Sequence, residues 1–268
     1  MPPSDLPTDP PGDPHLGSLA RDDGTVLAYY KTMAGKASGA EAAGRPGVVF
    51  LGGFMSDMSG TKAVALEAWA RRRGRAFLRF DYRGHGASSG RFEDGTIGDW
   101  AGDAVAALDA LTEGPQILVG SSMGGWIMLL AALERPRRVA SLVGIAAAPD
   151  FTEDLIWARA TPEQRRAIET VGYIDNPSSY SGTPYRITRR LIEKGRDHLL
   201  LSRPIPLTCP VRLIHGLEDL DVPWQTSLRL AAALESTDVE VTLVKGAAHR
   251  LSEPADIARL ERVIETLS

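Results

Sequence analysis

One glycine-rich stretch carries the clearest chemistry in the sequence. Residues 120–125 read GSSMGG and match the pattern G-x-S-x-G around Ser122. An apolar run at 117–119 leads into the stretch, and an apolar helical run at 126–133 leads out of it. In such a strand–turn–helix setting, flanking glycines relieve the crowding of a strained turn and leave the serine hydroxyl exposed above a sheet. We therefore predict that Ser122 is a nucleophile.

Two other roles are open to a turn of this kind. It could simply pack a helix against a strand, or it could bind a phosphate at the helix N-terminus. A phosphate loop requires the pattern G-x-x-x-x-G-K-[ST], and no lysine follows these glycines; the dinucleotide pattern G-x-G-x-x-G is absent as well. The sequence favours the nucleophile.

A serine hydroxyl needs a base to activate it and an acid to orient that base. Of the five histidines, His215 and His249 each follow a predicted strand that comes after Ser122. His215 ends its strand directly before a glycine, so we expect it in a structural turn. His249 lies in the loop between the last predicted strand and the last predicted helix, from which it can reach Ser122, and it is the predicted base.

The acid is expected in the loop after the penultimate predicted strand. Glu218, Asp219 and Asp221 all lie in this loop, and their spacing alone does not choose among them.

The negative charge that develops on an attacked carbonyl oxygen needs hydrogen-bond donors. Two glycines at 52–53 directly follow a predicted strand, which points to the backbone amides of Phe54 and of Met123 as an oxyanion hole. Met55, Met58 and Trp126, together with the Phe54 side chain, are candidates for an acyl-binding pocket, and each fits the hydrophobic core equally well.

The elements that would position these residues alternate along the chain. A hairpin at about 15–33 comes first, around a turn at 22–24. Strands are then expected at 48–51, 76–80, 117–119, 139–147, 211–214 and 239–244, and helices near 62–73, 97–112, 123–134, 224–235 and 254–267. Continuous apolar strands that alternate with helices predict an α/β fold with a parallel sheet covered on both faces.

Two segments depart from the alternation. Residues 1–14 contain six prolines and three acidic residues and are predicted to be a disordered arm. Residues from about 150 to 205 are polar and interrupted by proline and glycine, with two convincing short helices. We predict one domain at 15–268, into which residues 150–205 are inserted as a cap.

Composition excludes several functional classes. The 268 residues are 43% hydrophobic, carry a net charge of −4 and include a single cysteine, Cys209, which we expect to be a packing residue. A disulfide framework and a zinc site are therefore not expected. The acidic balance argues against a nucleic-acid partner, and the short basic run at 71–75 is typical of a solvated helix end. Since no apolar run approaches the roughly 20 residues of a membrane span, we expect a cytoplasmic protein. No pattern indicates an oligomeric state.

Two further stretches carry a family resemblance. Residues 81–88, DYRGHGAS, and the pattern G-x-x-D-x-x-V-P from Gly216 to Pro223 resemble turns of the α/β-hydrolase family. The resemblance extends over nearly the whole chain after the arm. It implies a mostly parallel eight-stranded sheet flanked by helices, with a short helical cap. It also implies Asp219 as the acid, with Asp221 as the alternative, and a structural role for His85.

The chain more closely resembles the mitochondrial acyl-glucuronide esterases and palmitoyl-protein thioesterases of that family and their bacterial relatives. The stretches at 58–63, 114–126, 204–216, 236–239 and 249–250 carry it, whereas the N-terminus lacks the basic, serine-rich character of a mitochondrial presequence. The resemblance implies a serine hydrolase without metal or cofactor. It would act on a small-molecule acyl ester or thioester, or on an S-acylated protein, through an acyl-enzyme on Ser122. The alternatives are a carbon–carbon bond hydrolase and a non-catalytic ligand-binding member of the fold.

Overall fold

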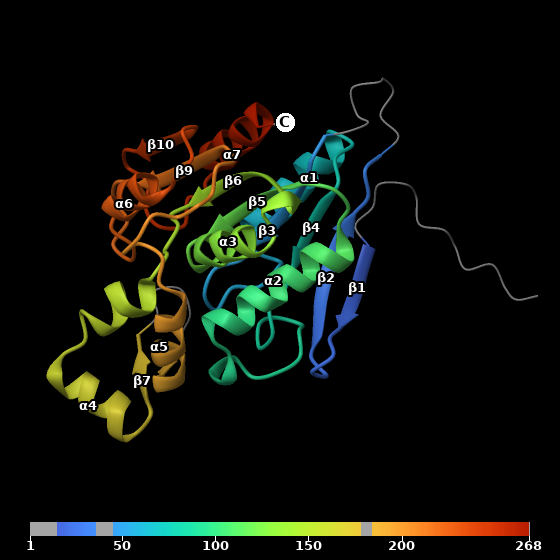
Figure 1. Cartoon of the computed structure of the whole chain (residues 1–268). Coiled ribbons are helices and arrows are strands. Elements are labelled where there is room, and N and C mark those ends of the chain that lie inside the picture. Colours follow the sequence, from blue (N-terminus) through green and yellow to red (C-terminus); the bar gives the residue numbers. More distant parts are fainter. Residues whose placement is uncertain (1–14, 36–44, 178–183, 268) are drawn as a thin grey trace, which may run out of the picture.

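A computed structural model describes residues 15–35, 45–177 and 184–267, and shows an eight-stranded sheet with helices packed against it (Figure 1). The predicted arm at 1–14 lies outside the described residues. The strands follow the order β1-β2-β4-β3-β5-β6-β9-β10. They are β1 (His15–Ala20), β2 (Val26–Thr32), β3 (Gly47–Leu51), β4 (Phe77–Phe80), β5 (Gln116–Ser121), β6 (Val139–Ile145), β9 (Val211–Gly216) and β10 (Val239–Val244).

Strand directions in the sheet agree with the prediction of an N-terminal hairpin followed by parallel strands. β2 runs antiparallel to both β1 and β4, so the expected hairpin forms one edge of the sheet. All other neighbouring strands of this sheet are parallel. Every residue of β3, β4 and β5 is buried, as expected where a parallel sheet is covered on both faces. The predicted α/β-hydrolase fold with a mostly parallel eight-stranded sheet is therefore confirmed.

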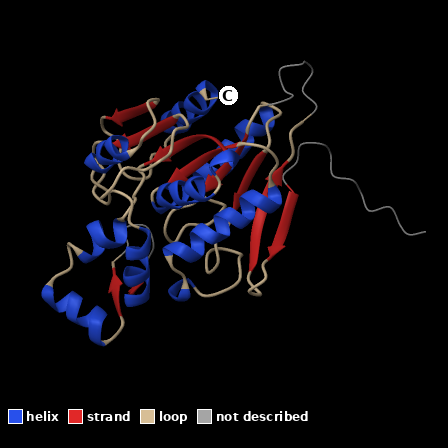
Figure 2. Cartoon of the chain, in the orientation of Figure 1, coloured by secondary structure: helices blue, strands red, loops and turns tan. Residues whose placement is uncertain are grey.

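Helices cover both faces of the sheet (Figure 2). Side chains of β3 alternate between two hydrophobic clusters: Val48 and Phe50 join one, and Val49 and Leu51 join the other. The first cluster includes buried residues of α1 (Thr61–Arg72) and α7 (Pro254–Thr266). The second includes those of α2 (Ile97–Leu111), α3 (Met123–Glu134) and α6 (Gln225–Ala233). The two-residue period of a strand thus divides the core into two layers.

The segment predicted to be a cap, residues 150–205, lies between β6 and β9 and is called the cap below. It contains η3 (Thr152–Trp157), α4 (Pro162–Thr170), β7 (Tyr173–Asn176), β8 (Tyr185–Thr188), α5 (Arg189–Gly195) and η4 (Arg196–His198). In Figure 1, α4, β7 and α5 stand beside the main sheet and not within it. β7 and β8 pair antiparallel as a separate sheet that the sequence did not predict.

Element boundaries agree closely with the predictions in the body of the fold. The helix at 123–134 and the strand at 239–244 match to the residue. β6 ends at Ile145, two residues earlier than expected, because the backbone of Ala146 turns to a positive φ of 45°. Among the described residues, no helix combines the length and the apolar character of a membrane span.

Candidate active site

Ser122 lies in the turn between β5 and α3. Its backbone has φ 54° and ψ −119°, a strained conformation for a residue other than glycine. The flanking glycines permit close packing around it. A Cβ atom on Gly124 would lie 2.1 Å from the carbonyl oxygen of Leu51, and a Cβ atom on Gly120 would lie 2.4 Å from the carbonyl oxygen of Gly124. The glycines therefore allow α3 to approach β3 and β5, and the turn presents the Ser122 side chain at the carboxyl edge of the sheet.

His249 joins Ser122 to Asp219. Its Nε2 atom lies 3.0 Å from Ser122 Oγ, and its Nδ1 atom lies 2.7 Å from Asp219 Oδ2. With Nδ1–H donating to the carboxylate, Nε2 is left to accept a hydrogen bond from the serine hydroxyl. This is the geometry in which a serine is activated by a histidine and the histidine is oriented by an acid.

Asp219 is fully enclosed and satisfied on both oxygens. Oδ1 accepts from the backbone amides of Asp221 at 2.9 Å and Val222 at 2.8 Å, while Oδ2 accepts from His215 Nε2 at 3.1 Å as well as from His249. Burial alone would raise the pKa of the Asp219 carboxyl, but the hydrogen bonds from His215 and His249 hold that pKa below its ordinary range. Asp219 is thus kept ionised beside the histidine. Asp221, in contrast, is exposed.

The two amides expected to form an oxyanion hole belong to different elements. The N–H of Met123 is the first in α3, so it has no acceptor within the helix. Phe54 lies in the loop after β3, and this loop is held at Met58. The amide of Met58 donates to Asp81 Oδ1 at 2.6 Å, and its carbonyl oxygen accepts from Arg79 Nη1 at 2.8 Å.

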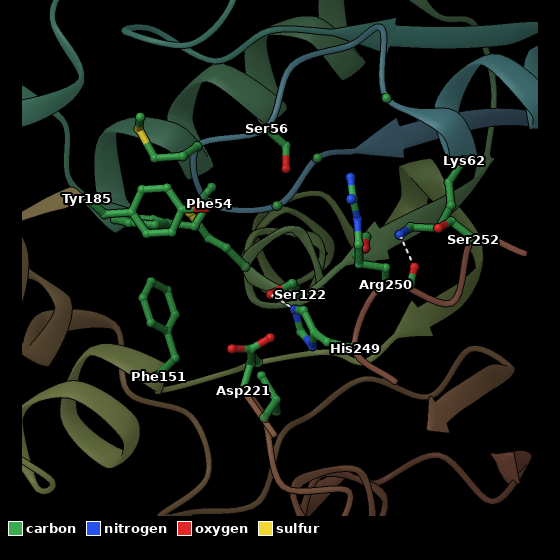
Figure 3. Close-up of a pocket in the computed structure, with 18 of the residues that line it drawn as sticks. Phe54, Ser56, Lys62, Ser122, Phe151, Tyr185, Asp221, His249, Arg250 and Ser252 are labelled. Atoms are coloured by element: carbon green, nitrogen blue, oxygen red, sulfur yellow. Dashed lines mark hydrogen bonds between the residues drawn. The ribbon is translucent and has the colours of Figure 1, made fainter. Parts of the chain in front are cut away.

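A cavity of about 670 Å³ surrounds Ser122 and His249. Figure 3 shows Phe54, Phe151 and Tyr185 on one side of Ser122, and Lys62, Arg250 and Ser252 on the other. Apolar residues of the cap, Leu155, Ile156 and Ile187, also line the cavity and belong to the same hydrophobic cluster as Phe54, Phe151 and Tyr185. On the second side the Lys62 ammonium donates to the carbonyl oxygen of Arg250, and burial lowers the pKa of Lys62 to about 8. The cavity therefore has an apolar wall and a polar wall, with the serine between them.

The structure places only some of the predicted binding residues at this cavity. Phe54, Met55 and Met123 line it, but Met58 and Trp126 do not. Trp126 is fully buried, and its indole N–H donates to the carbonyl oxygen of His198 at 3.1 Å. We therefore correct the expectation for both residues: Met58 and Trp126 are core residues.

Sequence reasoning missed the apolar residues that the cap contributes. Phe151, Leu155 and Ile156 come from its first turns, and Tyr185 and Ile187 come from β8. The apolar residues at 151, 155 and 156 recur at a helical spacing in an otherwise polar segment, and this signal could have identified them.

Three further residues singled out by the sequence do not line the cavity. His215 is not in a turn but within β9, fully buried against Asp219 and Ser227. His85 packs against the rings of Tyr82, Phe92 and Trp100, and burial lowers its pKa to about 4. The thiol of Cys209 is half-buried, and burial raises its pKa.

One group of side chains has the spacing of a cation site. Ligand atoms of Asp219, Asp221 and His249 all lie within 4.8 Å of one another. Both oxygens of Asp219 and both ring nitrogens of His249 already take part in hydrogen bonds. The hydrogen-bond network accounts for this grouping.

A serine, a histidine and a buried aspartate that are joined by hydrogen bonds at the carboxyl edge of a mostly parallel sheet are an arrangement typical of α/β-hydrolase folds. The chain belongs to the alpha/beta hydrolase family, whose model matches residues 48–260. It is a hydrolase, as its named relatives are.

The similarity to individual relatives extends over most of the chain. The mitochondrial palmitoyl-protein thioesterase ABHD10 of Bos taurus is 44% identical over 94% of this chain and 79% of its own length. The protein of the same name from Homo sapiens is 43% identical over the same shares. Among solved structures, mouse alpha/beta hydrolase domain-containing protein 10 matches with a TM-score of 0.85 at 42% identity, covering 94% of this chain and 98% of its own. A putative hydrolase from Agrobacterium vitis S4 matches with a TM-score of 0.88 at 40% identity, covering 96% and 99%.

These relatives correct one prediction from the sequence. The names of the ABHD10 proteins place those proteins in mitochondria, which contradicts the cytoplasmic location expected above. That expectation rested on the lack of an apolar run long enough to span a membrane. This feature does not distinguish the cytoplasm from the interior of an organelle.

Proposed function

We propose that the protein hydrolyses carboxylic thioesters and esters through an acyl-enzyme on Ser122. The observation that supports this most directly is the unbroken chain of contacts from Ser122 Oγ to His249 and on to Asp219. His249 takes the hydroxyl proton as Ser122 attacks the carbonyl carbon, and Asp219 stabilises the imidazolium that forms. The proton then passes from His249 to the departing thiolate or alkoxide.

The amides of Phe54 and Met123 are the proposed donors to the oxyanion. They would gain their hydrogen bonds as the carbonyl oxygen becomes negative, which lowers the energy of the transition state relative to the bound substrate. In the second half of the reaction, His249 activates a water molecule that attacks the acyl-enzyme. The products are the free acid and regenerated Ser122.

The two walls of the cavity suggest how the substrate lies. The apolar wall, formed by Phe54, Phe151, Tyr185 and the cap residues next to them, suits an acyl chain. The polar wall around Lys62 is left for the leaving group. Since relatives at 43–45% identity are named palmitoyl-protein thioesterases, we infer that the substrates include acyl thioesters, either small molecules or S-acylated proteins.

Labelling with a fluorophosphonate probe tests the nucleophile. We expect the native protein to be labelled and Ser122→Ala to remain unlabelled. Ser56→Ala is the matched control, because Ser56 lines the same cavity but takes no part in the hydrogen bonds between Ser122, His249 and Asp219. An unlabelled native protein, or equal labelling of Ser122→Ala, would reject the proposal.

Hydrolysis of matched acyl esters and thioesters of short and long chain length then tests the substrate class. We expect turnover of both kinds and a preference for chains long enough to contact the apolar wall. Equal rates for acetyl and long-chain substrates would contradict the proposed placement of the acyl group.

A further inference from the structure

We propose that His215 is a positioning residue that sets the basicity of His249 through a hydrogen bond to Asp219. The inference rests on the proposed function of Ser122, His249 and Asp219, and it adds a second histidine to their network. His215 lies in β9, four residues before Asp219, and its side chain is completely buried.

The partners of His215 show which ring nitrogen donates to Asp219. Nε2 lies 3.1 Å from Asp219 Oδ2 and 3.0 Å from the carbonyl oxygen of Val222, and both of these atoms only accept hydrogen bonds. Nε2 therefore carries the hydrogen. Nδ1 lies 2.7 Å from Ser227 Oγ, a hydroxyl that can donate to it or accept from it. The imidazole is thus a donor to Asp219 of fixed orientation, held by Asp219 and Val222 at Nε2 and by Ser227 at Nδ1.

His215 can affect catalysis because it and His249 donate to the same oxygen of Asp219. Oδ2 of Asp219 accepts from His249 Nδ1 at 2.7 Å and from His215 Nε2 at 3.1 Å. Each hydrogen bond that a carboxylate accepts stabilises its charge and lowers its affinity for a further proton. The bond from His215 therefore weakens the attraction of Asp219 for the His249 imidazolium. It leaves His249 available as a neutral base at lower pH, and it prevents the carboxylate from rotating away from the ring.

Other charged groups near His249 face it from the cavity. Asp221 has an oxygen within 4.8 Å of the ligand atoms of His249 and Asp219, and Arg250 follows His249 in the chain. Lys62 donates to the carbonyl oxygen of Arg250. His215 does not line the cavity and approaches Asp219 from the interior. Substitutions at His215 therefore leave these cavity-side charges in place.

Two amide substitutions at His215 distinguish the effect of its hydrogen bond to Asp219 from the effect of losing the imidazole ring. The amide of His215→Gln reaches the position of Nε2 and can donate to Asp219, whereas the shorter amide of His215→Asn reaches only the position of Nδ1 and keeps the partner of Ser227. Ser227→Ala is a third variant, which alters the opposite side of the ring. The measurement is the pH dependence of kcat/KM for an activated acyl ester, together with the pKa of His249 from the NMR shift of its ring proton.

We expect His215→Asn to raise the apparent pKa of the acidic limb and of His249 by about 0.5 to 1 unit, and to lower kcat on the order of 10-fold. His215→Gln should restore the native pH profile, and Ser227→Ala should shift it by less than half as much as His215→Asn. The proposal is overturned if folded His215→Asn keeps the native pKa of His249. It is equally overturned if His215→Gln or Ser227→Ala shifts the pKa as far as His215→Asn.

The native protein supplies an independent test that needs no variant to fold. Nitrogen NMR shifts should show a hydrogen on His215 Nε2 from pH 5 to pH 9, and a tautomer that carries its hydrogen on Nδ1 alone would overturn the proposal. If the native protein neither hydrolyses esters nor reacts with the serine probe, the proposed function fails. The His249 titration in the variants still reports on the bond from His215 in that case.

Discussion

The carboxyl edge of the sheet and the cap both contribute to one cavity, but their construction differs. At the edge, Ser122 has a strained backbone, and Asp219 is buried with four hydrogen-bond donors. In the cap, α4 buries a single residue, Ile168, and β7 buries none. The buried Asp150 carboxylate ties the two ends of the cap by accepting from the amides of Leu200 and Leu201, both at 2.8 Å.

This difference in packing suggests that the sheet edge serves catalysis and the cap serves substrate choice. Ser122 and Asp219 are held by elements that cannot shift without breaking buried contacts, which is what transition-state stabilisation requires. The apolar wall is built largely from the cap, where a substitution disturbs fewer buried neighbours. We therefore expect changes to the buried residues of the sheet edge to have large effects on the chemistry or the fold, and changes in the cap to have smaller effects, chiefly on substrate choice.

The largest expected effect is on catalysis at the sheet edge. Asp219→Asn should lower kcat by about 10³- to 10⁴-fold, because an amide cannot stabilise the imidazolium and favours the wrong tautomer of His249. Asp221→Asn is the matched control, and we expect it to cost less than 10-fold, since the Asp221 side chain is exposed and its backbone amide, which bonds Asp219, is unchanged. Steady-state kinetics on one ester checks both variants. A larger loss in Asp221→Asn would reverse the assignment of the acid.

The next largest expected effect is on stability, and it compares a glycine of the sheet edge with a glycine of the cap. Gly124→Ala should destabilise the fold by about 3 kcal/mol or more, because the new Cβ atom would lie 2.1 Å from a backbone oxygen of β3. Gly172→Ala, between α4 and β7, should cost about 1 kcal/mol, since Gly172 has φ +94° but nothing lies within 4 Å of the added atom. Urea denaturation measures both. Equal losses would contradict the view that the sheet edge is the more tightly packed region.

A third expected effect concerns pH. Burial lowers the pKa of His85 from 6.5 to about 4, so His85 is neutral in the folded protein at pH values where the unfolded chain takes up a proton. Stability is therefore unaffected above pH 6.5 and is lost as the pH falls from 6.5 toward 4. Between pH 7 and pH 5 we expect a loss of about 2 kcal/mol. Denaturation of the native protein and of His85→Gln at the two pH values isolates this contribution, and an equal loss in both proteins would exclude His85 as its source.

The sequence predicted most of the sheet edge because local patterns encode it. Continuous apolar runs marked β3 and β5, and the glycines around Ser122 marked a turn whose close packing the structure shows. The pairing of His249 with Ser122, by contrast, spans 127 residues, and only the predicted topology suggested it.

The parts that the sequence did not predict depend on tertiary contacts. The role of His215 was missed because its bond to Asp219 requires the loop after β9 to fold back on the strand. Trp126 was misplaced because an apolar helix offers apolar side chains on every face, and the sequence alone does not show which face meets the cavity. The β7–β8 pair was missed because its strands are short and polar.

The smallest expected effect tests the cap as the determinant of substrate choice. Ile156 lines the apolar wall from η3, and Ile156→Ala removes apolar contact that only a long acyl chain would make. We expect kcat/KM for a long-chain acyl thioester to fall about 5-fold, while the value for an acetyl thioester stays within 2-fold. Leu220→Ala at the rim of the cavity is the control, because Leu220 is 93% exposed and offers little buried contact. If Ile156→Ala slowed both substrates equally, the residue would act on the reacting atoms, and the division of tasks between cap and sheet edge would not hold.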